Sequence, residues 1–207
     1  MLNFLTTFSR RSTKKMDCLA DKSVWYSFIE GNVQAYSAIF RNFYPGLHNY
    51  GLKISGNETL TEDCLQDFFV YLYDNRENLG EIKSIKSYLF VSFRRALLKS
   101  LKKERAFTSE IPEQAQLENF EFSPEEIAIK QEFTAIKTAT LTTILNTLSK
   151  KERESIYLKY YSDLKVSEIA IVMDITYQSV LNNIQRAFSK IRKELENKAV
   201  QEIFLSN

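Results

Sequence analysis

Apolar residues recur three or four positions apart along most of the chain, which is the spacing of one helix face. In the N-terminal part this stripe consists of Val24, Phe28, Ala35, Ile39 and Phe43. Gly31 and Asn32 interrupt it, so we expect two helices there, and Tyr44-Pro45-Gly46 predicts a boundary before the next one. β-branched residues show no sustained alternation. The pattern therefore predicts an all-α fold.

A polar break at Ser55-Gly56-Asn57 precedes the next predicted helix. Thr59 and Glu62 have the spacing of a capping box, in which a hydroxyl and a carboxylate accept hydrogen bonds from free amides at a helix start. We therefore expect a helix from about Leu60 to Asn75.

A long basic helix is predicted in the middle of the chain. Its repeating positions are Tyr88, Val91, Arg95, Leu98 and Lys102. Residues 106–123 are rich in Glu and Gln and show little periodicity, as expected of an extended tether. Helices resume at Pro124, which suits a first helical turn. We expect an N-terminal tail (1–20), a helical domain (21–105), an acidic linker (106–123), a second helical domain (124–197) and a C-terminal tail (198–207).

The clearest local pattern lies near the C-terminus. Residues 167–173 are typical of a short helix, and Asp174-Ile175-Thr176 of a turn, with Thr176 as the cap of a second helix. The inward stripe of that second helix is Val180, Ile184, Ala187, Ile191 and Leu195. Two helices joined in this way fit a DNA-reading helix-turn-helix. An αα-corner without DNA function remains the alternative.

The polar face of the second helix carries side chains suited to DNA. Amides pair with an adenine edge, Arg forks onto guanine, and Lys neutralises phosphate. We expect duplex DNA to contact Tyr177, Gln178, Ser179, Asn182, Asn183, Arg186 and Lys190. A face that is merely solvated is the alternative interpretation.

Charge is divided into blocks, although the net charge is only +2. Residues 21–82 hold 4 basic and 9 acidic side chains, whereas residues 83–105 hold 8 basic and 1 acidic. Residues 106–126 then hold 6 acids and no base, and residues 150–198 hold 10 bases and 7 acids. Two separate basic patches of this kind can bind a polyanion.

Several classes of site are disfavoured. Cys18 and Cys64 form no CxxC pair, and His48 has no nucleophile beside it in the sequence, so we expect no disulfide, metal, cofactor or catalytic residue. No apolar run approaches the ~20 residues of a membrane span, and the N-terminus lacks the apolar core of a signal peptide. We therefore expect a cytoplasmic protein without membrane insertion or a small-molecule substrate.

Put together, the chain resembles the sigma-70 family, in the extracytoplasmic-function class that keeps only regions 2 and 4. The resemblance rests on three stretches. Residues 35–40 with Tyr44 are similar to the opening of region 2, and residues 62–69 to its polymerase-binding helix. Residues 148–153, 168–170 and 186–187 recur at the spacing of region 4. The resemblance implies two small helical domains and a sigma factor, not an enzyme, that directs promoter-specific initiation.

The family also implies roles for particular residues. The acidic helix would bind core RNA polymerase through Glu62, Asp63, Gln66 and Asp67. The basic helix and its preceding loop would hold promoter DNA as a single strand through Lys86, Tyr88, Arg94, Arg95, Lys99 and Lys102. Phe90 and Phe93 could be base platforms or core residues, with the core favoured for Phe93. Many relatives have an anti-sigma factor, so the resemblance also implies such a partner for this chain.

Two departures from the family bear on DNA binding. Lys99 replaces a frequent Asp, and Leu181 and Asn183 replace a frequent Lys and Arg, so fewer phosphate contacts are expected in the second domain. The linker acids Glu110, Glu113 and Glu118 are expected to mimic nucleic acid inside polymerase. Two other function classes stay open: a helix-turn-helix regulator that binds operator DNA without polymerase, and a helical adaptor that binds only protein.

Overall fold

We analysed a computed structural model of the chain, which describes residues 22–108, 120–130, 134–197 and 203. These residues form helices and connecting turns without a β-strand, which confirms the all-α prediction. The described residues form two compact units, the first mostly from residues before 120 and the second mostly from residue 120 onward. Both tails and the linker acids Glu110, Glu113 and Glu118 lie outside the described residues, apart from Ile203.

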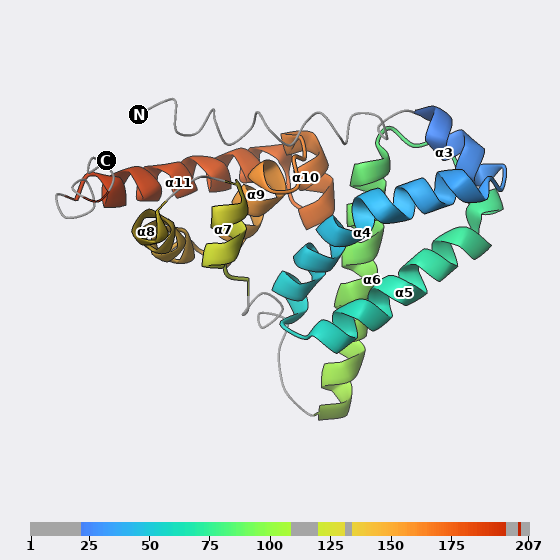
Figure 1. Cartoon of the computed structure of the whole chain (residues 1–207), viewed down its shortest axis with the longest axis horizontal. Coiled ribbons are helices and arrows are strands. Elements are labelled where there is room, and N and C mark those ends of the chain that lie inside the picture. The colour runs from blue at the N-terminus through green and yellow to red at the C-terminus, as the bar shows by residue number, and fades with distance from the viewer. Residues whose placement is uncertain (1–21, 109–119, 131–133, 198–202, 204–207) are drawn as a thin grey trace. The chain divides into compact units, whose positions relative to one another are not determined.

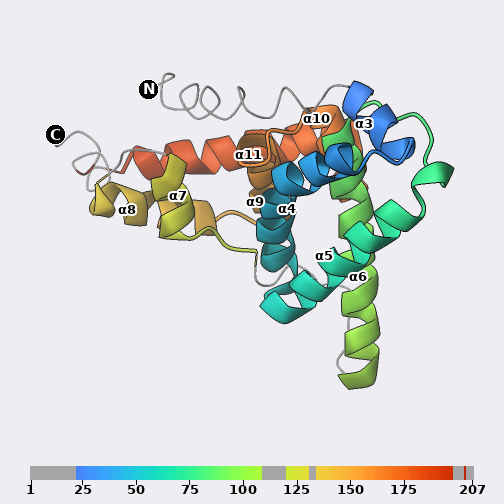
Figure 2. The ribbon, with the colours of Figure 1, turned by 45° about the vertical axis from the view of Figure 1, so that its right-hand side comes forward.

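The first unit is built on three long helices. Its elements are α3 (Lys22–Ile29), α4 (Val33–Ser55), α5 (Glu58–Asp74), the short 3₁₀ helix η2 (Arg76–Asn78) and α6 (Ile85–Thr108). Helices α4, α5 and α6 pack on one another, and α3 packs against α4. Figures 1 and 2 show α6 crossing both α4 and α5. This crossing leaves one face of α5 free to carry a binding surface.

The crossing is tight at Gly51 of α4. A Cβ built on Gly51 would lie 2.7 Å from Thr61 Cγ2 on α5 and 2.8 Å from Phe93 Cζ on α6. Contacts this short do not occur between real carbon atoms, so only glycine fits. Around this point each helix buries an apolar face, with Leu47, Leu65 and Phe93 all fully buried. Gly51 therefore brings the three helices together.

Two helix ends differ from the sequence prediction. Helix α5 begins at Glu58, and its cap is Asn57, whose side chain accepts a hydrogen bond of 3.1 Å from the amide of Leu60. The expected Thr59–Glu62 capping box is therefore wrong: Asn57 is itself a strong cap and takes the position two residues earlier. The neighbouring Thr61 does not cap the helix and is buried where α5 crosses α4.

The predicted boundary at Tyr44-Pro45-Gly46 is also wrong, because α4 runs through it without ending. Pro45 lacks the amide that would bond the carbonyl of Arg41. Both residues are exposed, so water can serve that carbonyl. Phe43 and Leu47 are buried on either side of the proline, and their packing favours a continuous helix.

The described residues from 120 onward form five helices in the second unit. They are α7 (Pro124–Lys130), α8 (Ala135–Asn146), α9 (Lys150–Tyr160), α10 (Val166–Met173) and α11 (Tyr177–Leu195). Helix α11 packs along α9 and against α8, and α7 packs against α8. Pro124 opens α7 as predicted. The predicted stripe of α11 also faces inward, with Val180, Ala187 and Ile191 buried.

The linker ends earlier than predicted. Phe120 and Phe122 are buried, and their rings lie 5.6 Å and 6.3 Å from the ring of Tyr157 on α9. The Asn146 side chain also bonds both the amide (2.8 Å) and the carbonyl (3.0 Å) of Phe122. Residues 120–123 therefore belong to the second unit, because their aromatic side chains complete its core.

Candidate polymerase and nucleic-acid interfaces

The acidic residues of α5 share one exposed face. We call this face, formed by Glu62, Asp63, Gln66 and Asp67, the acidic face; all four residues are exposed. Residues three and four apart on a helix are neighbours on its surface. The opposite side of α5 buries Leu65, Phe68 and Leu72 in the core. The acidic face is thus held by a packed helix and available to a partner.

Two large apolar side chains extend the acidic face by one turn. Val70 is 52% exposed and Tyr71 is 63% exposed. They follow Gln66 and Asp67 by four residues, so they lie on the same side of α5. Sequence reasoning missed them, although this spacing from the acidic residues was a usable signal. Exposed aromatic and aliphatic side chains beside a charged surface are typical anchors of protein interfaces.

His48 on α4 lies at the edge of the acidic face. Its Nε2 is 3.7 Å from Glu62 Oε1, and Glu58 contributes a third potential ligand, all three atoms lying within 4.8 Å of one another. This donor set could accept a metal ion, and tertiary packing creates it from residues far apart in sequence. Both carboxylates are exposed, so we treat the group as a polar cluster rather than a metal centre.

Helix α6 carries the predicted basic track. Arg95, Lys99 and Lys102 are exposed, and their spacing of four and three residues places them on one side of the helix. Lys86, in the first turn of the same helix, and Arg94, nearer its middle, are half-buried. The three exposed side chains span about 10 Å along α6, given a rise of about 1.5 Å per residue, and are available to neutralise phosphates over that length.

Tyr88 is half-buried at the start of α6. Its ring lies edge-on to Trp25 at 5.2 Å, and burial raises the pKa of its phenol, so the side chain stays neutral at physiological pH. Phe90 and Phe93 are buried at 2% and 0% exposure. Both are core residues, which excludes them as base platforms. Tyr88 is left as the aromatic candidate on this helix.

The helix-turn-helix has the geometry that the sequence predicted. Asp174 turns the chain with φ 55°, and the amide of Ile175 donates to the carbonyl of Ala170 at 3.0 Å. The Thr176 hydroxyl then accepts from the amide of Ser179 at 3.1 Å and caps α11. The turn therefore fixes where α11 begins and which of its residues face solvent.

The start of α11 presents an ordered polar face. Tyr177 is 54% exposed, and Arg186 is exposed nine residues, or two and a half turns, further on. The Gln178 amide donates to Asn182 Oδ1 at 3.0 Å, which leaves an acceptor on Gln178 and a donor on Asn182 for other groups. Ser179 is half-buried and shares a 2.8 Å hydrogen bond with Thr176. One acceptor beside one donor matches an adenine edge in the major groove.

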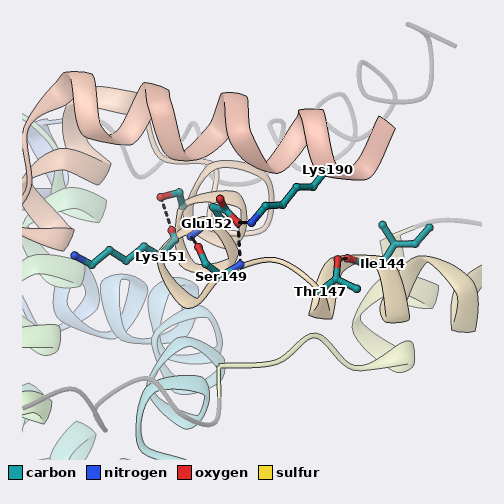
Figure 3. A network of polar contacts seen from close by, with 7 residues as sticks. Ile144, Thr147, Ser149, Lys151, Glu152 and Lys190 are labelled. Carbon is teal, nitrogen blue, oxygen red and sulfur yellow. Dashed lines mark hydrogen bonds and ion pairs between the residues drawn. The ribbon is translucent and has the colours of Figure 1, made fainter. Parts of the chain in front are cut away.

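The expectation for Asn183 is wrong. Asn183 is only 9% exposed, and its amide donates to Ser155 Oγ on α9 at 3.3 Å. It lies between the inward stripe and the polar face of α11, so its position along the sequence did not decide its direction. Lys190 remains half-exposed, but its Nζ lies 2.7 Å from Glu152 Oε2 on α9 (Figure 3). Neither side chain is simply presented to solvent.

Family models match both units. The sigma-70 region 2 model matches residues 39–107, and the sigma-70 region 4 model matches residues 138–191. A search of the curated proteins found no match. The chain belongs to the sigma-70 family, whose regions 2 and 4 it carries. As such it acts with RNA polymerase and promoter DNA in starting transcription.

Two solved structures have a similar fold. CnrH, in complex with the cytosolic domain of CnrY, is 18% identical, with a TM-score of 0.56 over 86% of this chain and 99% of that one. The sigma factor RpoE of Bartonella quintana, in complex with the anti-sigma factor NepR, is 16% identical, with a TM-score of 0.56 over 80% of this chain and 99% of that one. Among the described residues, no helix combines the length and apolar character needed to cross a membrane.

Proposed function

We propose that this sigma factor binds core polymerase through the acidic face of α5 and reads promoter DNA with two separate helices. The observation that carries the proposal is the exposure of Glu62, Asp63, Gln66 and Asp67 together on a helix whose other side is locked in the core. A rigid surface of this kind loses little conformational freedom on binding. Val70 and Tyr71 would add apolar contact area beside the charges.

The two basic helices would divide the promoter between them. On α6, Tyr88 would stack on an unpaired base, and Arg95, Lys99 and Lys102 would follow the phosphates of the separated strand. On α11, Gln178, Asn182 and Arg186 would read a duplex element in the major groove. Stacking on a flipped base offsets the cost of unstacking it, so opening would require no nucleotide hydrolysis by this chain.

The partners follow from the same assignment. Polymerase would supply the catalysis, which places the chain in the cytoplasm beside it. A protein of the anti-sigma kind would bind the free chain, as the anti-sigma factor NepR is bound to RpoE and the cytosolic domain of CnrY to CnrH in the two similar structures. The linker acids Glu110, Glu113 and Glu118 would occupy a basic path in polymerase and would leave it when RNA is made. Reversing these acids to Lys would then weaken core binding and alter promoter escape.

The decisive experiment is co-purification with core polymerase. The double variant Glu62→Lys with Asp67→Lys should lose at least about tenfold in affinity, because like charges across an interface cost several kcal/mol. The matched control is Glu30→Lys with Glu77→Lys, which makes the same charge change at exposed positions off α5. The control should bind as the natural chain does.

Two results would contradict the proposal. Equal loss in both double variants would mean that net charge, rather than the acidic face, governs association. A symmetric footprint on duplex DNA by the chain alone, without polymerase binding, would instead support a helix-turn-helix regulator. In vitro transcription with purified core polymerase would then show no starts that depend on this chain.

A further inference from the structure

Two polar side chains of α11 turn toward α9 rather than toward DNA. Asn183 donates to Ser155 Oγ at 3.3 Å, and Lys190 donates to Glu152 Oε2 at 2.7 Å. They are seven residues apart, which is two helical turns, so they lie on the same side of α11 about 10 Å from each other. Together they tie the helix to α9 at two separated points.

Both acceptors on α9 are built into that helix. Glu152 is 4% exposed, and its carboxylate also accepts from the Ser149 amide at 2.8 Å, which completes the capping box of α9. Ser155 is fully buried and donates its own hydroxyl to the Lys151 carbonyl at 2.7 Å. Figure 3 shows Lys190 reaching from α11 to Glu152 beside Ser149. The hydrogen bonds within α9 therefore fix the positions of both acceptors without any contribution from α11.

We propose that Asn183 and Lys190 are positioning residues that set the angle at which α11 enters the major groove. Two ties about 10 Å apart resist rotation and sliding of a helix, whereas an apolar stripe alone tolerates both. The reading side chains Gln178, Asn182 and Arg186 are spaced four residues apart on the neighbouring face. Base contacts need placement within about 0.5 Å, so they depend on this orientation. The inference rests on the proposed reading of duplex DNA by α11.

The test separates a tie from a phosphate contact by salt dependence. A phosphate contact contributes about 0.9 to the slope of log affinity against log salt, because binding it releases a counterion. Holoenzyme would be titrated with a duplex that carries the upstream element of a promoter mapped by sequencing its transcription starts. Lys190→Met should weaken binding about fivefold, as expected for loss of a partly buried ion pair, and leave the slope unchanged. The matched control is Lys193→Met, because Lys193 is exposed, lies two turns after Arg186 on the same face of α11 and would contact phosphate; this variant should lower the slope by about 0.9.

Conservative variants complete the test. Lys190→Arg should restore most of the affinity, because Arg can reach the same carboxylate. Glu152→Gln keeps a cap on α9, since Gln also serves in a capping box, and should weaken DNA binding as Lys190→Met does. The double variant should be no weaker than either single one, as expected of partners in one interaction. Asn183→Ala should weaken binding without changing the slope.

Three outcomes would overturn the inference. Lys190→Met could lower the salt slope as Lys193→Met does, which would make Lys190 a phosphate contact. It could leave the affinity unchanged, or its effect could add to that of Glu152→Gln, and either result would remove the tie. If holoenzyme formed but the natural chain conferred no binding to any promoter duplex, the proposed function of α11 would fail instead. Circular dichroism of each variant would confirm that the second unit is folded.

Discussion

Single residues determine how closely the helices of the first unit approach. Gly51 lies where α4 meets both α5 and α6, and a side chain there would overlap Thr61 and Phe93. Gly46, one turn and a half earlier on α4, has room for a methyl group, since an added Cβ would make an ordinary contact of 3.9 Å with Phe90 Cζ. Replacing each of these two glycines should therefore have opposite effects on the stability of the same helix.

Gly51→Ala should lower the free energy of unfolding by about 1–3 kcal/mol, because an overpacked core must shift to accept the methyl group. Gly46→Ala should instead raise it by up to about 1 kcal/mol, through the better helix propensity of alanine. Urea denaturation followed by circular dichroism measures both. Equal effects in the two variants would show that the crossing at Gly51 is not tight.

The sequence could not predict in which direction every side chain of a helix points. The spacing of Glu62, Asp63, Gln66 and Asp67 placed them together because they share a face of one regular helix. The prediction for Asn183 was wrong because this residue borders the inward stripe of α11. The direction of its side chain there depends on the position of Ser155 on another helix. Tertiary packing, rather than local pattern, decides such borderline positions.

At the scale of elements, helix positions were predicted better than helix ends. Periodicity located the helices because burial of an apolar face determines where a helix forms. The ends depended on competition among neighbouring polar residues, in which Asn57 displaced Thr59 as the cap of α5. Pro45 did not break α4, because the packing of Phe43 and Leu47 outweighs one missing hydrogen bond. Phe120 and Phe122 lay in a segment that resembled a tether by composition alone.

Helix α9 gives the second unit a specific response to acid. Burial tends to raise the pKa of Glu152, but hydrogen bonds from Lys190 and Ser149 outweigh it, and the pKa lies below its ordinary value of 4.5. A carboxyl group with a lowered pKa contributes stability above its unfolded pKa and loses it as pH falls through the folded one. This contribution should therefore decrease as the pH falls below 4.5 and be lost once the pH has passed the lower pKa of the folded state.

Glu152→Gln removes the titrating group and should flatten this part of the stability profile. The measurement is the free energy of unfolding of the full chain by urea between pH 3 and pH 7, with the signal of the second unit followed separately. At neutral pH the variant should be less stable, and the difference from the natural chain should shrink as pH falls. A difference that is constant with pH would contradict the assignment.

At the scale of the whole molecule, the charge blocks of the sequence correspond to separate surfaces. The acidic block contributes the face of α5, and the two basic blocks contribute α6 and the C-terminal helices. Regular helices explain this success, since they keep neighbouring side chains in order on one face. Val70 and Tyr71 escaped prediction because apolar residues on an amphipathic helix are usually buried, and only their exposure in the structure distinguishes them.

The proposed division of the promoter predicts opposite defects in two variants. Tyr88→Leu keeps an apolar side chain against Trp25 but removes the ring. The free energy of strand opening should therefore become less favourable by the ~1–3 kcal/mol that one stacked base contributes. Arg186→Ala should weaken duplex binding and leave opening of bound promoter intact. Permanganate reactivity of unpaired thymines on holoenzyme complexes measures the opening.

A template with a preformed bubble provides the control. It should restore transcription by the Tyr88→Leu holoenzyme, because the strands are already separated, and should not restore that of Arg186→Ala. Rescue of both variants, or of neither, would contradict the division of labour between α6 and α11.

The chain has a single tryptophan, Trp25, which is 1% exposed. Its indole donates to the carbonyl of Gly80 at 3.1 Å, and its ring faces the edge of Tyr88 at 5.2 Å. Indole emission depends on the polarity and mobility of its surroundings, and the natural chain thus contains its own spectroscopic probe. A base that stacked on Tyr88, as proposed, should change the fluorescence of Trp25, and this change could be followed in real time without a label.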